Sequence, residues 1–139
     1  YKANVIPQVA TAVVDGRFLP GHEETLMKTM RELAGDDAEI EILVRDKALE
    51  VDFDGPLVEA MCAAILAEDP EGIPIPYVMS GGTDNKALSD LGITGYGFSP
   101  LKLPADLDFF ALFHGVDERV PVDGLKFGVR SLLHFLHHA

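Results

Sequence analysis

The chain of 139 residues lacks the features that mark several common classes of protein. No apolar run reaches about 18 residues, so the sequence predicts no membrane span. Its one cysteine, Cys62, cannot form an internal disulfide, which favours a reducing, cytoplasmic environment. Basic residues are also scarce, with 11 lysines and arginines against 23 acidic residues and a net charge of −12. Nucleic acids and anionic membranes are therefore not expected as partners.

What is present is an alternation of strand-like and helix-like patterns. Residues 9–19 alternate in the manner of a half-buried strand, with Gly16 on one face and Asp15 and Arg17 on the other. Helical spacing follows and ends at Gly35, and residues 39–45 alternate again. The first 45 residues therefore predict a β-α-β unit.

The rest of the chain continues this alternation after a charged junction at residues 46–54. The predicted elements are, in order, a helix beginning at Pro56, a strand at 73–79, a short helix after "SGGTDN" (80–85), a strand at 94–98 and a final helix beginning at Pro121. Strands that alternate with helices indicate an α/β architecture with some parallel pairing, here in two subdomains.

The segment "SGGTDN" is a candidate anion-binding turn. Paired glycines let backbone N–H groups face a ligand, and the start of a helix favours a negative charge such as a carboxylate. The lysine-serine or lysine-threonine pair that a phosphate-binding loop requires at a set spacing is absent. The alternative is an ordinary tight turn capped by Thr83 or Asp84.

Arg17 lies on the polar face of its predicted strand and could clamp a carboxylate through two parallel hydrogen bonds. Asp15 lies two residues away on the same face. Taken without the rest of the sequence, this spacing favours a simple surface salt bridge between Asp15 and Arg17.

His114 ends an apolar run at residues 109–113 and precedes Asp117 and Glu118. It could be a metal ligand or a buried imidazole that is satisfied by the backbone. A zinc site needs three or four ligands, and one histidine with two nearby acids is a weak local pattern.

The order of these motifs resembles one known family. "NVIP", an arginine thirteen residues after its asparagine, "GGTD" at a strand-to-helix turn and "HGVDE" before a closing helix follow one another. Together they resemble the dinuclear zinc metallopeptidases and amidohydrolases, a family that includes succinyl-diaminopimelate desuccinylase, acetylornithine deacetylase, aminoacylase and glutamate carboxypeptidase.

The resemblance implies a fold and a site. Residues 1–46 would be the second half of a ferredoxin-like lid domain that mediates dimerisation. Residues 47–139 would be the C-terminal part of an α/β zinc-exopeptidase catalytic domain. The residues implied in substrate binding are Asn4, Arg17, Gly81, Gly82 and Thr83. His114 would be a zinc ligand, and Glu118 a supporting acid.

The chain also departs from the family pattern. Asp117 stands where the family often has asparagine, no His-x-Asp motif is present, and the one Glu-Glu pair, Glu23–Glu24, belongs to the lid helix. We therefore expect a fragment of a zinc-dependent hydrolase that cleaves amide bonds of N-acyl amino acids or short peptides. The intact parent would hold two zinc ions, whereas this chain would bind zinc weakly and be inactive alone. A start at Tyr1 without methionine also indicates a fragment.

Two alternatives come from other functional classes. One is a non-catalytic dimerisation or interaction module, and the other is a lone acidic domain that binds a small ligand at the glycine turn. We also expect self-association, because open strand edges and uncovered apolar faces favour pairing with another chain. Residues 9–19 and 101–113 are the surfaces expected to be covered.

Overall fold

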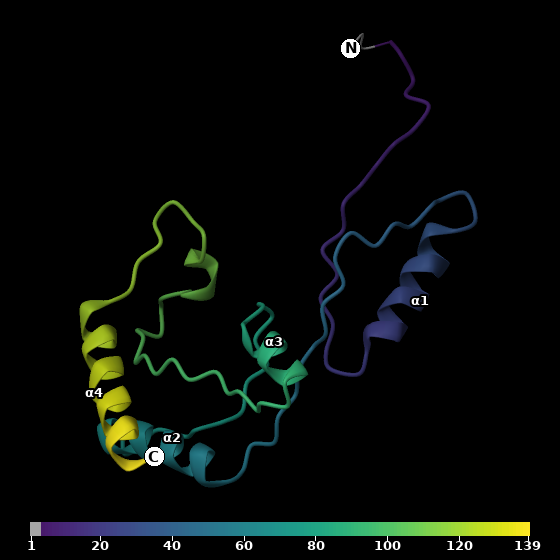
Figure 1. Cartoon of the computed structure of the whole chain (residues 1–139). Helices are drawn as coiled ribbons and strands as arrows, with labels where there is room; N and C mark the ends of the chain where they lie inside the picture. Colours follow the sequence, from purple (N-terminus) through teal and green to yellow (C-terminus); the bar gives the residue numbers. More distant parts are fainter. Residues whose placement is uncertain (1–3) are drawn as a thin grey trace.

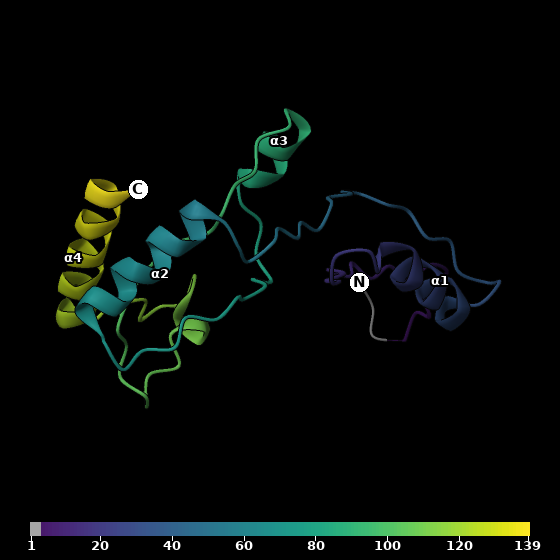
Figure 2. The same cartoon turned by 90° about the horizontal axis from the view of Figure 1, so that it is seen from below.

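The computed structural model describes residues 4–139 and contains helices separated by long connections. The helices are α1 (Glu23–Ala34), α2 (Pro56–Glu68), α3 (Asn85–Asp90), the short 3-10 helix η1 (Phe110–Leu112) and α4 (Val122–His138). In Figures 1 and 2, α1 lies at one end of the molecule, α2 and α4 lie together at the other end, and α3 lies between them. None of these helices has the length and hydropathy that a bilayer crossing needs.

The helices begin close to the predicted positions, and α1 ends at the predicted Gly35. Two acidic residues occupy the first turn of α1, where they complement the helix dipole, and Gly35 ends it with φ of 73°. Pro56 is the first residue of α2, a position where its missing N–H costs nothing. The final helix begins at Val122, one residue after the predicted Pro121. The four predicted helices are thus confirmed.

The structure assigns no strand between residues 4 and 139. The segments predicted as strands, residues 9–19, 39–45, 73–79 and 94–98, run as connections without helix (Figure 1). A strand is defined by hydrogen bonds to a neighbouring strand, and these segments make none to one another. The α/β class, the lid unit and the boundary at residue 46 stay predictions.

The core of the described chain lies between α2 and α4, the one helix pair in residues 4–139 that packs together. The buried apolar side chains are Val58, Met61 and Ala64 of α2 and Phe127 of α4. Small residues let the two helices approach closely, since Ala64 and Ser131 are fully buried. An ion pair between Arg130 and Glu68, 2.5 Å long, joins the same two helices at their surface.

The apolar face that the sequence shows along α4 is not the buried side of this helix. Leu125, Val129 and Leu136 are 51%, 50% and 70% exposed. The buried side of α4 instead carries two glycines, Phe127 and Ser131. The two glycines lie against the backbone of another segment, since a Cβ on Gly124 would lie 3.0 Å from the carbonyl oxygen of Lys102 and one on Gly128 would lie 2.5 Å from that of Pro100.

The first part of the chain folds against α1. A Cβ atom on Gly16 would lie 2.9 Å from Cδ2 of Leu26, so Gly16 faces that helix, as its place on the small-residue face of the predicted strand requires. Residues 15 and 17 are its immediate neighbours, and in extended backbone they point to the opposite side. The recorded partners of Asp15 and Arg17 are each other and, for Arg17, the carbonyl of Ser80.

Candidate functional site

Arg17 is the centre of the candidate site. Its Nε donates to Oδ1 of Asp15 at 2.8 Å, and its Nη2 donates to Oδ2 of the same carboxylate at 2.5 Å. The salt bridge that the sequence favoured is therefore confirmed, in the bidentate form that is strongest for arginine and carboxylate. In addition, Nη1 of Arg17 donates to the carbonyl oxygen of Ser80.

The contact with Ser80 joins two segments that are 63 residues apart in the chain. It brings Arg17 to the start of the turn that carries Gly81, Gly82 and Thr83. Two predicted parts of one binding site, the arginine and the glycine turn, thus lie together. The sequence offered no sign of the Ser80 carbonyl as a partner, because every residue carries a carbonyl and only the tertiary structure selects one.

Two ion pairs tie α3, the helix after this turn, to the charged junction of the chain. Nζ of Lys86 lies 3.1 Å from Oδ2 of Asp46, and Lys47 pairs with Asp90. Lys86 is half-buried and the other three side chains are exposed, so each pair contributes about 1 kcal/mol or less to stability. Their effect is to hold the glycine turn next to the segment that leaves the α1 unit.

The glycine turn keeps its backbone donors available. No hydrogen bond recorded within residues 4–139 uses the N–H of Gly81, Gly82 or Thr83. Neither glycine has a positive φ, so the turn does not depend on left-handed backbone. The predicted side-chain cap is absent as well, since Asp84 precedes α3 without a capping hydrogen bond. The turn can therefore offer N–H groups to a ligand.

The remaining predicted site residues are not drawn into this arrangement. Asn4 is exposed, and no recorded hydrogen bond within the described range involves it. His114 is exposed just after η1 and has φ of 59°, a conformation rare for a residue with a side chain. Glu118 is also exposed, and no recorded ion pair joins it to His114 in the part of the chain that the structure describes.

His114 does not belong to a cluster of three or more possible metal ligands among the residues that the structure describes. Within that range no group of three or more histidine, cysteine, aspartate or glutamate side chains could hold a metal ion. A zinc ion needs at least three protein ligands for firm binding. The expectation that this chain binds zinc weakly stays a prediction.

The apolar run before His114 folds into an aromatic cluster. Phe109, Phe110 and Phe113 contact one another with ring centroids 5.1 to 6.4 Å apart, and Tyr77 reaches Phe110 at 5.8 Å. Phe110 remains 59% exposed. The cluster is thus a partly uncovered apolar surface next to His114, and its burial by self-association stays a prediction.

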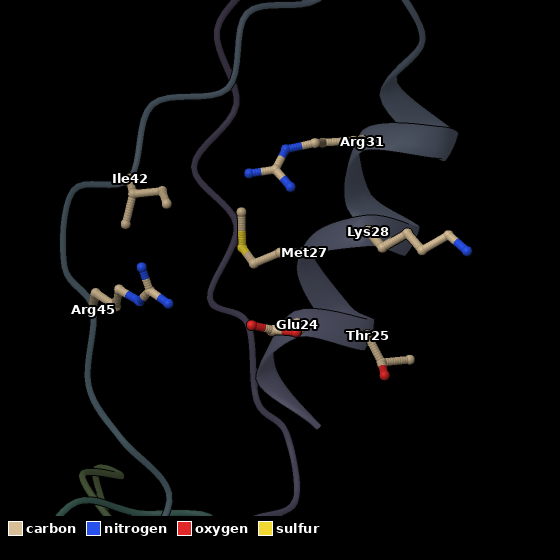
Figure 3. Close-up of a pocket in the computed structure, with 7 residues that line it drawn as sticks. All are labelled: Glu24, Thr25, Met27, Lys28, Arg31, Ile42 and Arg45. Atoms are coloured by element: carbon tan, nitrogen blue, oxygen red, sulfur yellow. The ribbon is translucent and has the colours of Figure 1, made fainter. Parts of the chain in front are cut away.

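A groove of about 510 Å³ lies between α1 and the segment at residues 42–45. Figure 3 shows Met27 and Arg31 pointing toward that segment, whereas Thr25 and Lys28 point away from it. Arg45 at its edge pairs with Glu23 at 2.5 Å. Because the groove contains none of the predicted site residues and lies on the α1 side, it is separate from Arg17 and the glycine turn.

The electrostatics of the site follow from the pair of Asp15 and Arg17. Hydrogen bonds from Arg17 lower the pKa of Asp15 below its ordinary value of 3.8, and the same bonds raise the pKa of Arg17. Asp15 is thus ionised at neutral pH. Because its folded pKa is depressed, any stabilisation by the pair is present above pH 3.8 and is lost as the pH falls through the lower value.

We expect Arg17→Gln to raise the pKa of Asp15 back toward 3.8, since the variant loses the positive charge and the bidentate hydrogen bonds of the guanidinium. Carbon-13 NMR of the Asp15 carboxyl during an acid titration measures this change. Arg31→Gln, which removes an equal charge from α1, is the matched control and should leave the titration of Asp15 in place. An unchanged midpoint in Arg17→Gln would contradict the pairing.

Comparisons with known proteins find distant relatives over nearly the whole chain. It is 28% identical over 145 residues to the human N-fatty-acyl-amino acid synthase/hydrolase PM20D1, covering 99% of this chain and 28% of that protein. The bovine protein of the same name is 27% identical over 145 residues, with the same coverage. Probable carboxypeptidase S-like 2 of Dictyostelium discoideum is 26% identical over 143 residues, covering 99% of this chain and 26% of that protein.

The chain spans little more than a quarter of the length of these relatives. No family model matches it, and no solved structure matches it significantly. The names of the relatives describe a hydrolase of N-fatty-acyl amino acids and a carboxypeptidase. At this coarse level the comparisons support hydrolase or peptidase character, in agreement with the resemblance of its motifs to the metallopeptidases.

Proposed function

We propose that this chain is part of a zinc-dependent amidohydrolase or peptidase, and that it binds the carboxylate end of the substrate. The substrate class is an N-acyl amino acid or a short peptide. The observation that carries the proposal is the hydrogen bond from Arg17 to the carbonyl of Ser80, because it brings the arginine and the glycine turn into one place. The distant relatives, named as an N-acyl-amino acid hydrolase and a carboxypeptidase, support the same class.

The chemistry of this place suits a carboxylate. A guanidinium offers five N–H donors, and Asp15 and Ser80 use three of them. The two that remain can bond to one carboxylate, and the N–H groups of Gly81 and Gly82 supply neutral donors beside them. Binding would hold the substrate by its free carboxylate and so fix the position of its amide bond.

The hydrolytic step itself is assigned to the whole protein. In this proposal His114 supplies one zinc ligand, and its strained φ of 59° fits a residue whose position function demands. Glu118 supports it. The other ligands and the base lie elsewhere in the whole protein, since the relatives are more than three times as long as this chain.

We expect Arg17→Ala to weaken carboxylate binding at least tenfold, because charge-assisted hydrogen bonds contribute about 1.5–3 kcal/mol each. The measurement is an NMR titration of the full chain with N-acetyl-L-alanine, followed at the amide signals of Gly81, Gly82 and Thr83. The neutral probe N-acetyl-L-alanine amide should not shift these signals.

Arg31→Ala is the matched control, since it removes an exposed arginine from α1. It should bind N-acetyl-L-alanine as the natural chain does. The proposal fails if the two arginine variants weaken binding equally, or if the natural chain does not distinguish the acid from its amide.

A further inference from the structure

Arg17 does not meet a ligand as a free cation. Asp15 occupies the edge formed by Nε and Nη2, with donor–acceptor distances of 2.8 and 2.5 Å. Ser80 accepts from Nη1. The side chains of Asp15 and Arg17 are 70% and 59% exposed, so neither packing nor burial accounts for the orientation of the guanidinium. Its hydrogen bonds set it, and the carboxylate of Asp15 accepts two of the three.

We propose that Asp15 is the specificity-determining residue of this site: it positions Arg17 against the glycine turn and restricts the site to ligands with a single carboxylate. The inference rests on the proposed function, since it takes the site to be a carboxylate receptor. It goes further by defining the substrate class as an N-acyl monocarboxylate, and by giving the selective role to a residue outside the predicted substrate-binding set.

The count of donors supports this restriction. Because Arg17 keeps one N–H on Nη1 and one on Nη2, it can satisfy one carboxylate and has no paired edge for a second. The other cation at the turn is Lys86, whose Nζ lies 3.8 Å from the position of a Cβ on Gly82. Lys86 is also engaged, at 3.1 Å, by Asp46.

The charges at the turn also support the restriction to a single carboxylate. Each of these two cations already has an acidic partner, so the turn carries no surplus positive charge from them. One ligand carboxylate gains from the remaining donors. A second ligand carboxylate finds no unpartnered cation among these groups and meets the negative charge of Asp15. For an assumed separation of about 5 Å, Coulomb's law in water makes this repulsion a roughly three- to fivefold loss of affinity.

The test compares two probes on the full chain, N-acetyl-L-alanine with one carboxylate and N-acetyl-L-glutamate with two. Asp15→Asn keeps the shape of the side chain and removes its charge. We expect the ratio of glutamate-probe affinity to alanine-probe affinity to rise roughly three- to fivefold in this variant at low salt. Asp37→Asn, in the turn after α1, removes an equal charge and should leave the ratio unchanged.

A second measurement needs no ligand. The Nε–H proton of Arg17 should exchange slowly with water in the natural chain, because Asp15 accepts from it. In Asp15→Asn the exchange should quicken several-fold, since a neutral amide oxygen is a weaker acceptor and the second bond is lost. Equal exchange rates in the two chains would overturn the positioning role.

The outcomes separate this inference from the proposed function. If Arg17→Ala abolishes binding while Asp15→Asn leaves the affinity ratio unchanged, the site receives carboxylates but Asp15 does not select among them, and the inference is overturned. If the natural chain binds neither probe, the proposed function fails and the inference fails with it. A raised ratio in Asp15→Asn with an unchanged ratio in Asp37→Asn supports both.

Discussion

Replacing Phe127 by alanine should largely unfold the pair of α2 and α4. Phe127 is 7% exposed and is the one large side chain that α4 contributes to the described core, where it joins Val58 and Met61. Removing a buried phenylalanine costs about 3–5 kcal/mol, through lost burial and the cavity that remains. Because a small domain is stable by only about 5–15 kcal/mol, the loss is a large share of the total.

Urea unfolding followed by circular dichroism, with hydrogen exchange of the α2 and α4 amides, measures this effect. Phe110→Ala is the matched control, since Phe110 is 59% exposed and its ring contacts are with Tyr77, Phe109 and Phe113. It should cost about 1 kcal/mol or less. Similar losses in both variants would show that the core is not where α2 meets α4.

Gly128→Ala should destabilise the chain although alanine is the better helix former. A Cβ on Gly128 would lie 2.5 Å from the carbonyl oxygen of Pro100, a backbone atom of a buried residue that cannot turn aside. The gain in helix propensity is about 1 kcal/mol. Overpacking against fixed neighbours costs about 1–3 kcal/mol and a displaced segment costs more, so we expect a net loss of about 1–2 kcal/mol.

Gly97→Ala provides the same chemical change at a site with space for it. No atom lies within 4 Å of a Cβ placed there, and Gly97 has no positive φ. Its stability should stay within about 0.5 kcal/mol of the natural chain. The midpoint of urea unfolding compares the two variants. A higher midpoint in Gly128→Ala would mean that the backbone near Pro100 moves at little cost in free energy. The gain in helix propensity would then exceed the cost of overpacking.

The helices could be predicted because their signals are local. Acids in the first turn of α1, Gly35 at its end, and Pro56 at the first position of α2 act through the dihedral angles and dipoles of a few adjacent residues. The pair of Asp15 and Arg17 is equally local, since the two residues share a face two positions apart. Such features need no knowledge of the rest of the fold.

Other features could not be predicted because they depend on a distant partner. The sequence shows leucines and valines along one face of α4, yet the buried side of the helix carries Phe127 and Ser131. Hydrophobicity indicates which residues gain from burial, but only the shape of the partner decides which face fits. The predicted strands are a similar case, because a strand needs a neighbour that alternation alone does not identify.

The sequence by itself determined the positions of the helices, the acidic charge of the chain, the salt bridge at Arg17 and the order of motifs that indicated a hydrolase. Only the tertiary structure decided that Arg17 meets the carbonyl of Ser80, which makes the arginine and the glycine turn one candidate site. The physical reason is the separation along the chain over which each interaction acts. Backbone propensities and neighbouring charges act over a few residues, whereas a contact across 63 residues depends on how the whole chain between them is placed.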